Sequence, residues 1–158
     1  MNEAVTVTPA KVLDEEVVSA LGALLPQLSS SARADRQLLV QLIEHDATTL
    51  YLARARGRVV GALTLVTYPL PTGLRAHIED VVVDQSARGL GIGEALVRTA
   101  LAAVGSLGAK SVDLTSRPSR EAAIGLYTRV GFTRRDSHTY RYTPDRPEQN
   151  TRADPNEF

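Results

Sequence analysis

Three glycines at alternate positions form the part of this sequence with the clearest chemical meaning. Gly89, Gly91 and Gly93 follow the apolar run at 81–83 and precede a stretch whose apolar residues have helical spacing. Such glycines let a backbone approach a ligand closely and point several N–H groups into one concavity. A helix that begins there adds a partial positive charge. The segment therefore predicts a phosphate or pyrophosphate site, although a tight turn from strand to helix would use the same glycines.

Two common phosphate loops do not fit this pattern. The nucleotide-binding P-loop needs Lys and then Ser or Thr after its last glycine, whereas Gly93 is followed by Glu94 and Ala95. The dinucleotide-binding fingerprint, counted from Gly89, needs a glycine where Glu94 stands, and it usually opens its domain. The glycine segment, however, lies past the middle of the chain. Neither phosphate loop therefore fits this sequence.

Two motifs resemble those of one family. Residues 88–93, from Arg88 to Gly93, are similar to the Gln/Arg-x-x-Gly-x-Gly/Ala signature of the GNAT superfamily of N-acetyltransferases. Residues 123–132 resemble its Ala-x-x-Leu-Tyr-x-x-x-Gly-Phe segment, with Tyr127 as the tyrosine. Many members carry a cofactor-binding asparagine seven residues before that tyrosine, where this chain has Arg120. The resemblance covers roughly residues 5–142, nearly all of the chain except its polar end.

The resemblance implies acetyl-coenzyme A as co-substrate. It implies that the loop amides bind the pyrophosphate, that the apolar strand end pairs with the pantetheine arm, and that the arginine at 120 lies near the cofactor. We expect no metal, and the absence of cysteine excludes a thiolate metal site, a disulfide and a cysteine nucleophile. The expected cofactor-binding residues are Val81, Val82, Val83, Arg88, Gly89, Leu90, Gly91, Ile92, Gly93, Glu94 and Arg120.

Acetyl transfer to an amine needs a base, because an amine with a pKa near ~10.4 is about one-thousandth free base at neutral pH. Glu79 is the candidate: its segment resembles the strand of glucosamine-6-phosphate and diamine N-acetyltransferases, where a Glu-Asp pair precedes an apolar run. His77 is the alternative base, and Asp80 is expected to have a structural or substrate-orienting role. Strand alternation places His77, Glu79, Val81 and Val83 on one face unless a bulge intervenes. Solvated charges at a strand entrance would give the same pattern.

Tyr127 is the candidate for the leaving group. The resemblance implies that it protonates or hydrogen-bonds the coenzyme A sulfur. Proton transfer from a phenol near pKa ~10 to a thiolate near ~8.5 is uphill by about 1.5 units, or roughly 2 kcal/mol. Without a raised thiolate pKa, Tyr127 therefore only hydrogen-bonds the sulfur. Packing against Val130 and Phe132 is compatible with this role.

The wider pattern predicts the elements that position these residues. The order β-α-α-β-β-β-α-β-α-β indicates an α/β (α+β) domain, a mixed sheet with helices on both faces. We expect one GNAT domain over 1–142 and a disordered tail over 143–158, since the tail is polar and has no periodicity. The expected helices cover 14–28, 33–44, 93–104 and 119–130, and the expected strands 5–7, 48–56, 59–68, 77–83, 110–115 and 132–142.

Composition limits the partners. Eighteen basic and eighteen acidic residues cancel, and without a basic block we expect neither nucleic acid nor membrane binding. We find no signal-peptide pattern and no apolar run of about 20 residues, so we expect a cytoplasmic protein. The expected acceptor is a small-molecule or peptide amine, and a homodimer is left open. The alternatives are a GNAT-fold module that senses acyl-CoA without turnover, or a transferase for another acyl-CoA or a hydroxyl acceptor.

Overall fold

One five-stranded sheet organises the chain. The computed structural model describes residues 4–145, and its strands lie in the order β1-β2-β3-β4-β5, antiparallel except for the parallel β4–β5 pair. The expected order of elements is confirmed through the last helix. The elements are β1 Thr6–Pro9, α1 Glu15–Leu28, α2 Arg36–Glu44, β2 Thr48–Ala55, β3 Arg58–Leu70, β4 Gly73–Val83, the 3-10 turn η1 Gln85–Ala87, α3 Ile92–Leu107, β5 Val112–Asp113 and α4 Glu121–Arg129.

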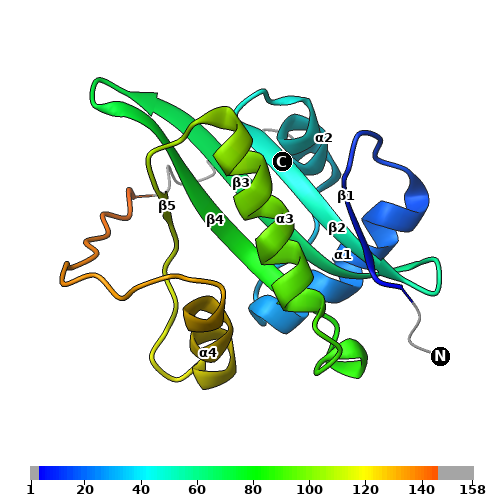
Figure 1. Cartoon of the computed structure of the whole chain (residues 1–158). Helices are drawn as coiled ribbons and strands as arrows, with labels where there is room; N and C mark the ends of the chain where they lie inside the picture. The colour runs from blue at the N-terminus through cyan, green and yellow to red at the C-terminus, as the bar shows by residue number, and fades with distance from the viewer. Residues whose placement is uncertain (1–3, 146–158) are drawn as a thin grey trace, which may run out of the picture.

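Helices cover both faces of the sheet, as expected. Figure 1 shows α3 lying across one face, with α1 and α2 on the other. Side-chain alternation on β2 separates the two cores: Leu50 and Leu52 pack with α1 and α2, whereas Tyr51 and Ala53 pack with α3. The mixed α/β architecture predicted from the sequence is confirmed.

Aspartates fix the starts of the first two helices. Asp14 caps α1 by accepting a hydrogen bond from the Val17 N–H at 2.9 Å. Asp35 caps α2 by accepting from the N–H groups of Gln37 and Leu38. Each cap satisfies backbone donors that the helix leaves without an internal partner. Apolar side chains of both helices then pack on the sheet, and the end of α1 reaches the site described below.

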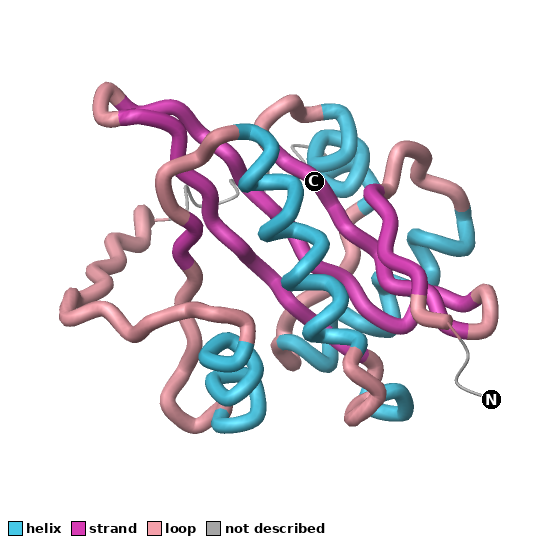
Figure 2. The backbone as a smooth tube through the Cα atoms, viewed as in Figure 1, coloured by secondary structure: helices cyan, strands magenta, loops and turns pink. Residues whose placement is uncertain are grey.

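The predicted strand at 132–142 is wrong. Residues after α4 form no strand up to Asp145, and Figure 2 shows this stretch as loop. Tyr140 and Tyr142 are both exposed. Between Thr133 and Thr139 the segment carries no aliphatic side chain, so it has no apolar face to bury against the helices. The predicted tail at 143–158 lies almost wholly outside the described residues.

The predicted start of α4 is also displaced. The helix begins at Glu121, and its N-cap is Arg120, which makes no side-chain capping bond. Ser119 therefore precedes the helix and does not cap it. The strand predicted at 110–115 is shortened to two residues, because β5 pairs with β4 only at Ala76 and His77 among the described residues.

Candidate active site

A bulge near the end of β4 shifts the phase of its side chains. On β3, Ala62 and Thr64 are two residues apart, but their partners Val82 and Glu79 are three apart. Asp80 carries the extra residue and has a φ of 52°, which is uncommon for a residue with a side chain. Uninterrupted alternation is therefore wrong here. Glu79 and Val82 share the face covered by α1 and α2, while Val81 packs on the α3 side.

One edge of β4 is unpaired where the bulge occurs. Beyond His77, β5 makes no further pairs with β4 within residues 4–145. The chain instead leaves the sheet toward α4, which Figure 1 shows beyond the β4 edge. An unpaired strand edge presents N–H and C=O groups that an extended ligand can use. The end of β4, residues 81–83, therefore offers backbone hydrogen bonds to an extended amide-containing molecule.

The glycine loop leads into an uncapped helix. Gly91 is the N-cap of α3 in the left-handed conformation, with a φ of 75°, and no described side chain caps this end. The first N–H groups of α3 therefore lack the side-chain acceptor that α1 and α2 have. A Cβ at Gly91 would meet no heavy atom within 4 Å. This arrangement fits a phosphate group, which would satisfy the free amides and the helix dipole.

Gly93 has a different reason to be glycine. A Cβ built there would lie 3.0 Å from Leu126 Cδ1 of α4 and 3.7 Å from Val83 Cγ2. Real Cβ atoms rarely come so close, so the missing side chain lets α4 approach the first turn of α3. Gly93 therefore brings the second predicted motif, on α4, next to the first.

A cleft of about 850 Å³ lies between these elements. Its volume is within the range of small-molecule and cofactor sites. Most of the predicted cofactor-binding residues line the cleft, together with Tyr127. Leu90 and Glu79 do not line it, and Leu90 is 65% exposed. The predicted residues in its lining are Val81, Val82, Val83, Arg88, Gly89, Gly91, Ile92, Gly93, Glu94, Arg120 and Tyr127.

Tyr127 is half-buried on α4 where this helix meets the cleft. Its ring makes an edge-to-face contact with Phe132 at 5.9 Å between centroids, and the Phe132 N–H donates to the Tyr127 carbonyl at 2.9 Å. Burial raises the pKa of Tyr127 above its usual value, while Arg120 opposes the shift. The phenol is therefore protonated at neutral pH and available as a hydrogen-bond donor in the cleft.

Glu79 and His77 form a pair at the entrance to this region. His77 Nε2 lies 3.2 Å from Glu79 Oε1, with 26% and 53% of the two side chains exposed. Glu79 and the cleft residue Val82 are neighbouring positions on one face of the sheet, in rows about 7 Å apart. The two candidate bases predicted from the sequence are thus brought together, beside the cleft and outside its lining.

The charges of the cleft favour an anion. Arg88, Arg120 and Arg129 line it together with Glu94 and Glu121. Glu94 lies in the first turn of α3, where it would compete with a bound phosphate, but arginines hold its carboxylate. Arg98 lies 2.8 Å from one carboxylate oxygen and Arg129 lies 3.7 Å from the other.

Nine lining residues were not among the predicted site residues: Gln27, Leu28, Ala87, Ser119, Glu121, Ala122, Ala123, Leu126 and Arg129. Arg129 lies inside the α4 motif, two residues after Tyr127, so the motif could have indicated that it lines the cleft. Gln27 and Leu28 end a helix that is far away in sequence, and no local motif marks them. Within the described chain, no three His, Asp or Glu side chains are grouped to hold a metal ion. None of its helices is long and apolar enough to cross a membrane.

Comparison with known proteins identifies the family. The model of the "Acetyltransferase (GNAT) family" matches residues 15–132, which include the whole cleft lining. The chain belongs to the GNAT acetyltransferase family. The membership predicted from the two motifs is thus confirmed.

Individual relatives agree with this membership. The chain is 40% identical over 88 residues to a glucosamine 6-phosphate N-acetyltransferase of Trypanosoma brucei brucei, covering 54% of this chain and 58% of that protein. It is 36% identical over 89 residues to a mycothiol acetyltransferase of Thermomonospora curvata, covering 56% and 29%. Both alignments therefore span less than two thirds of the relative.

The solved structures extend the likeness in fold. An aminoglycoside acetyltransferase from an uncultured soil metagenomic sample superposes with a TM-score of 0.75 at 17% identity, covering 90% of this chain and 97% of the other. At this identity the comparison shows a shared fold, and it does not indicate which acceptor this chain uses.

Proposed function

We propose that this chain is an acetyl-CoA-dependent N-acetyltransferase that acetylates a primary amine by direct attack in a ternary complex. One observation carries the proposal: the uncapped start of α3, the unpaired edge of β4 and the Tyr127 phenol surround one cleft. Phosphate, extended amide and thioester sulfur are groups that acetyl-CoA combines in one molecule. Family membership supports the same activity.

Different residues of the chain bind different parts of the cofactor. The loop amides from Arg88 to Glu94 bind the pyrophosphate, and the β4 end at 81–83 hydrogen-bonds the pantetheine arm in the manner of a strand. Arg120, which stands in the place of the usual asparagine, provides a cation on the α4 side of the cleft. When bound, acetyl-CoA supplies the activated acetyl thioester.

Glu79 is the proposed base. It accepts the proton of the acceptor ammonium, directly or through a water, and so raises the fraction of free amine at neutral pH. His77, whose Nε2 lies 3.2 Å from Glu79 Oε1, orients the carboxylate. Glu79 lies on the face of β4 that α1 and α2 cover. We propose that the acceptor binds on this face, while the adjacent free edge of β4 binds the cofactor.

Tyr127 is proposed to serve the sulfur by hydrogen bonding. Its raised pKa makes it a weaker acid than a free phenol, so complete proton transfer to a thiolate is more than about 2 kcal/mol uphill before the cleft acts on the thiolate. A hydrogen bond to the developing charge needs no such transfer and strengthens as the sulfur leaves.

Calorimetric titration of the chain with acetyl-CoA tests the proposal, followed by an assay of free coenzyme A thiol with a panel of amines. The panel includes glucosamine 6-phosphate, an aminoglycoside, a polyamine and a peptide. We expect low-micromolar binding and thiol release that depends on one class of amine. No binding at millimolar acetyl-CoA would refute the proposal. Binding without thiol release for any amine or hydroxyl acceptor would favour the acyl-CoA-sensing module instead.

A further inference from the structure

The side-chain amide of Gln27 uses all of its polar atoms. In the last turn of α1, Nε2 donates to the Ala23 carbonyl and to Asp84 Oδ2, each at 3.2 Å. Oε1 accepts from the Gln85 N–H at 2.9 Å. With the amide reversed, its oxygen would face the Asp84 carboxylate and its NH₂ group would face the Gln85 N–H. The partners therefore determine this orientation. A helix-end glutamine is thereby joined to residues 57 and 58 positions later in the chain.

Asp84 occupies the junction between β4 and the loop. Its Oδ1 accepts from Ser86 at the backbone N–H, 2.8 Å, and at the hydroxyl, 2.5 Å. Its own N–H donates to the Val60 carbonyl of β3 at 2.8 Å. Hydrogen bonds from Ser86 and then Gln27 lower the pKa of Asp84, so the group is a carboxylate near neutral pH. Asp84 thus ties the start of η1 to the sheet.

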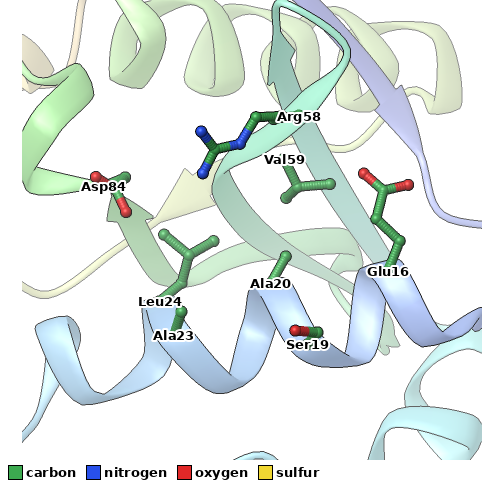
Figure 3. A pocket seen from close by; sticks show the side chains of 8 residues that line it. All are labelled: Glu16, Ser19, Ala20, Ala23, Leu24, Arg58, Val59 and Asp84. Carbon is green, nitrogen blue, oxygen red and sulfur yellow. The ribbon is translucent and has the colours of Figure 1, made fainter.

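A second cavity, of about 270 Å³, has Asp84 in its lining. Figure 3 shows Asp84 there, above Leu24 of α1, with the Arg58 guanidinium from β3 extending toward it. The Arg58 charge also contributes to the lowered pKa of Asp84. Asp84 thus lines this cavity, while its hydrogen-bond partner Gln27 lines the cofactor cleft. Gln85 and Ser86 are exposed, and Asp84 is only half-buried. The position of the junction therefore depends on hydrogen bonds more than on packing.

We propose that Gln27 is a positioning residue for the cofactor loop. By holding Asp84 and Gln85 against the end of α1, it fixes the direction in which the chain leaves β4, and so the orientation of the loop amides at 88–94. Gln27 acts through these two residues rather than on the reacting atoms. The inference rests on the proposed function, in which these amides bind the pyrophosphate.

Gln27→Met tests the hydrogen bonds, since methionine keeps the side-chain length and removes the amide. Gln41→Met is the matched control, because Gln41 is an exposed helical glutamine of α2 whose side chain makes no hydrogen bond among residues 4–145. We expect Gln27→Met to speed amide hydrogen exchange at Gln85 and Ser86 at least severalfold without ligand. It should also weaken acetyl-CoA binding by about tenfold, the size expected for one or two ordinary hydrogen bonds. Gln41→Met should leave both measurements unchanged.

Gln27→Glu gives a second readout, which a merely structural role would not move. Its carboxylate still accepts from the Gln85 N–H but faces the Asp84 carboxylate, so at neutral pH the two repel. As the pH falls from about 7.5 to 5, one of them takes up a proton and the contact re-forms. The Kd ratio of Gln27→Glu to wild type should therefore fall toward one, while the ratio for Gln41→Glu stays flat.

The ratio isolates the new pair of carboxylates. Titration of the coenzyme A phosphates affects both proteins and cancels. The other charged groups around the junction, Glu16 on α1, Arg58 on β3 and Arg88 in the loop, are also common to both proteins.

Two results would overturn the proposal: wild-type exchange at Gln85 and wild-type affinity in Gln27→Met, or a Kd ratio for Gln27→Glu that does not change with pH. If Gln27→Met fails to fold, the Gln27→Glu series decides. Failure of the wild-type chain to bind acetyl-CoA would refute the proposed function. The exchange rates of Gln85 and Ser86 would then still decide whether Gln27 holds the loop.

Discussion

Replacing Gly91 and Gly108 with alanine separates backbone strain from ligand binding. The two glycines flank α3 at its N- and C-terminal ends, with φ values of 75° and 72°. At both, a Cβ would meet no heavy atom within 4 Å. The left-handed conformation costs an alanine about 1–2 kcal/mol. Since each kcal/mol lowers the Tm of a domain of this size by about 2–4 °C, both variants should melt about 2–8 °C below wild type.

Acetyl-CoA should distinguish the two variants. Only Gly91 lines the cleft, so only there does the new methyl group hinder the approach of a phosphate to the backbone. At a concentration of 100 times its Kd, the ligand stabilises wild type and Gly108→Ala by about 2.7 kcal/mol, or a Tm shift of about 5–11 °C. A tenfold weaker Kd leaves Gly91→Ala about 1.4 kcal/mol, or about 3–6 °C.

Thermal melts with and without acetyl-CoA measure these shifts, and calorimetric titration gives each Kd directly. A full wild-type ligand-induced shift in both variants would refute the assignment of the Gly91 loop as the pyrophosphate site. Equal losses of the shift in both would trace the effect to helix strain rather than to the cleft. Only a selective loss in Gly91→Ala agrees with the geometry.

Three further outcomes follow from individual side chains. Glu79→Gln should lower kcat/KM mainly at low pH and recover as pH approaches the amine's own pKa; a loss that does not change with pH contradicts the role as base. Tyr127→Phe should lower kcat by about 10²–10⁴ with unchanged affinity for acetyl-CoA; wild-type kcat would leave it only a packing role. Because the pKa of Asp84 is lowered in the folded chain, its carboxylate stabilises the fold at pH values above the unfolded pKa of ~3.9. This stabilisation is lost as the pH falls below that value. Urea midpoints should therefore drop less steeply below pH ~4 in Asp84→Asn than in wild type, and parallel curves would contradict this.

The order of elements was predictable because local patterns determine it. Apolar periodicity located α1, α2 and α3, and the start of α3 predicted at residue 93 lies one residue after the observed start at Ile92. The strand predicted after α4 failed for the opposite reason: the polar residues from Thr133 to Thr139 give this segment no apolar face to bury. Hydrophobic patterns thus predicted the elements that pack in the core and failed for the segment that does not.

Contacts between distant segments were not predictable. Gln27 reads as one more polar residue of an amphipathic helix, and nothing near it in sequence indicates Asp84 or Gln85. The two glycine effects were equally hidden: Gly91 is required by a positive φ, whereas Gly93 is required by Leu126 on another helix. The motif predicted the site, but the reasons for its residues come from three-dimensional packing.

The bulge at Asp80 matters most for the proposed chemistry. With regular alternation, Glu79 and Val81 would lie on one face, and base and cofactor would compete for the same side of β4. The extra residue turns Glu79 toward α1 and α2 and Val81 toward α3. It falls next to the stretch where β4 has no β5 partner, so the edge that would bind the pantetheine arm adjoins the face that carries the proposed base. In the proposed mechanism, one irregular residue would thereby let a single strand contact both substrates, and neither of the two sequence motifs contains that residue.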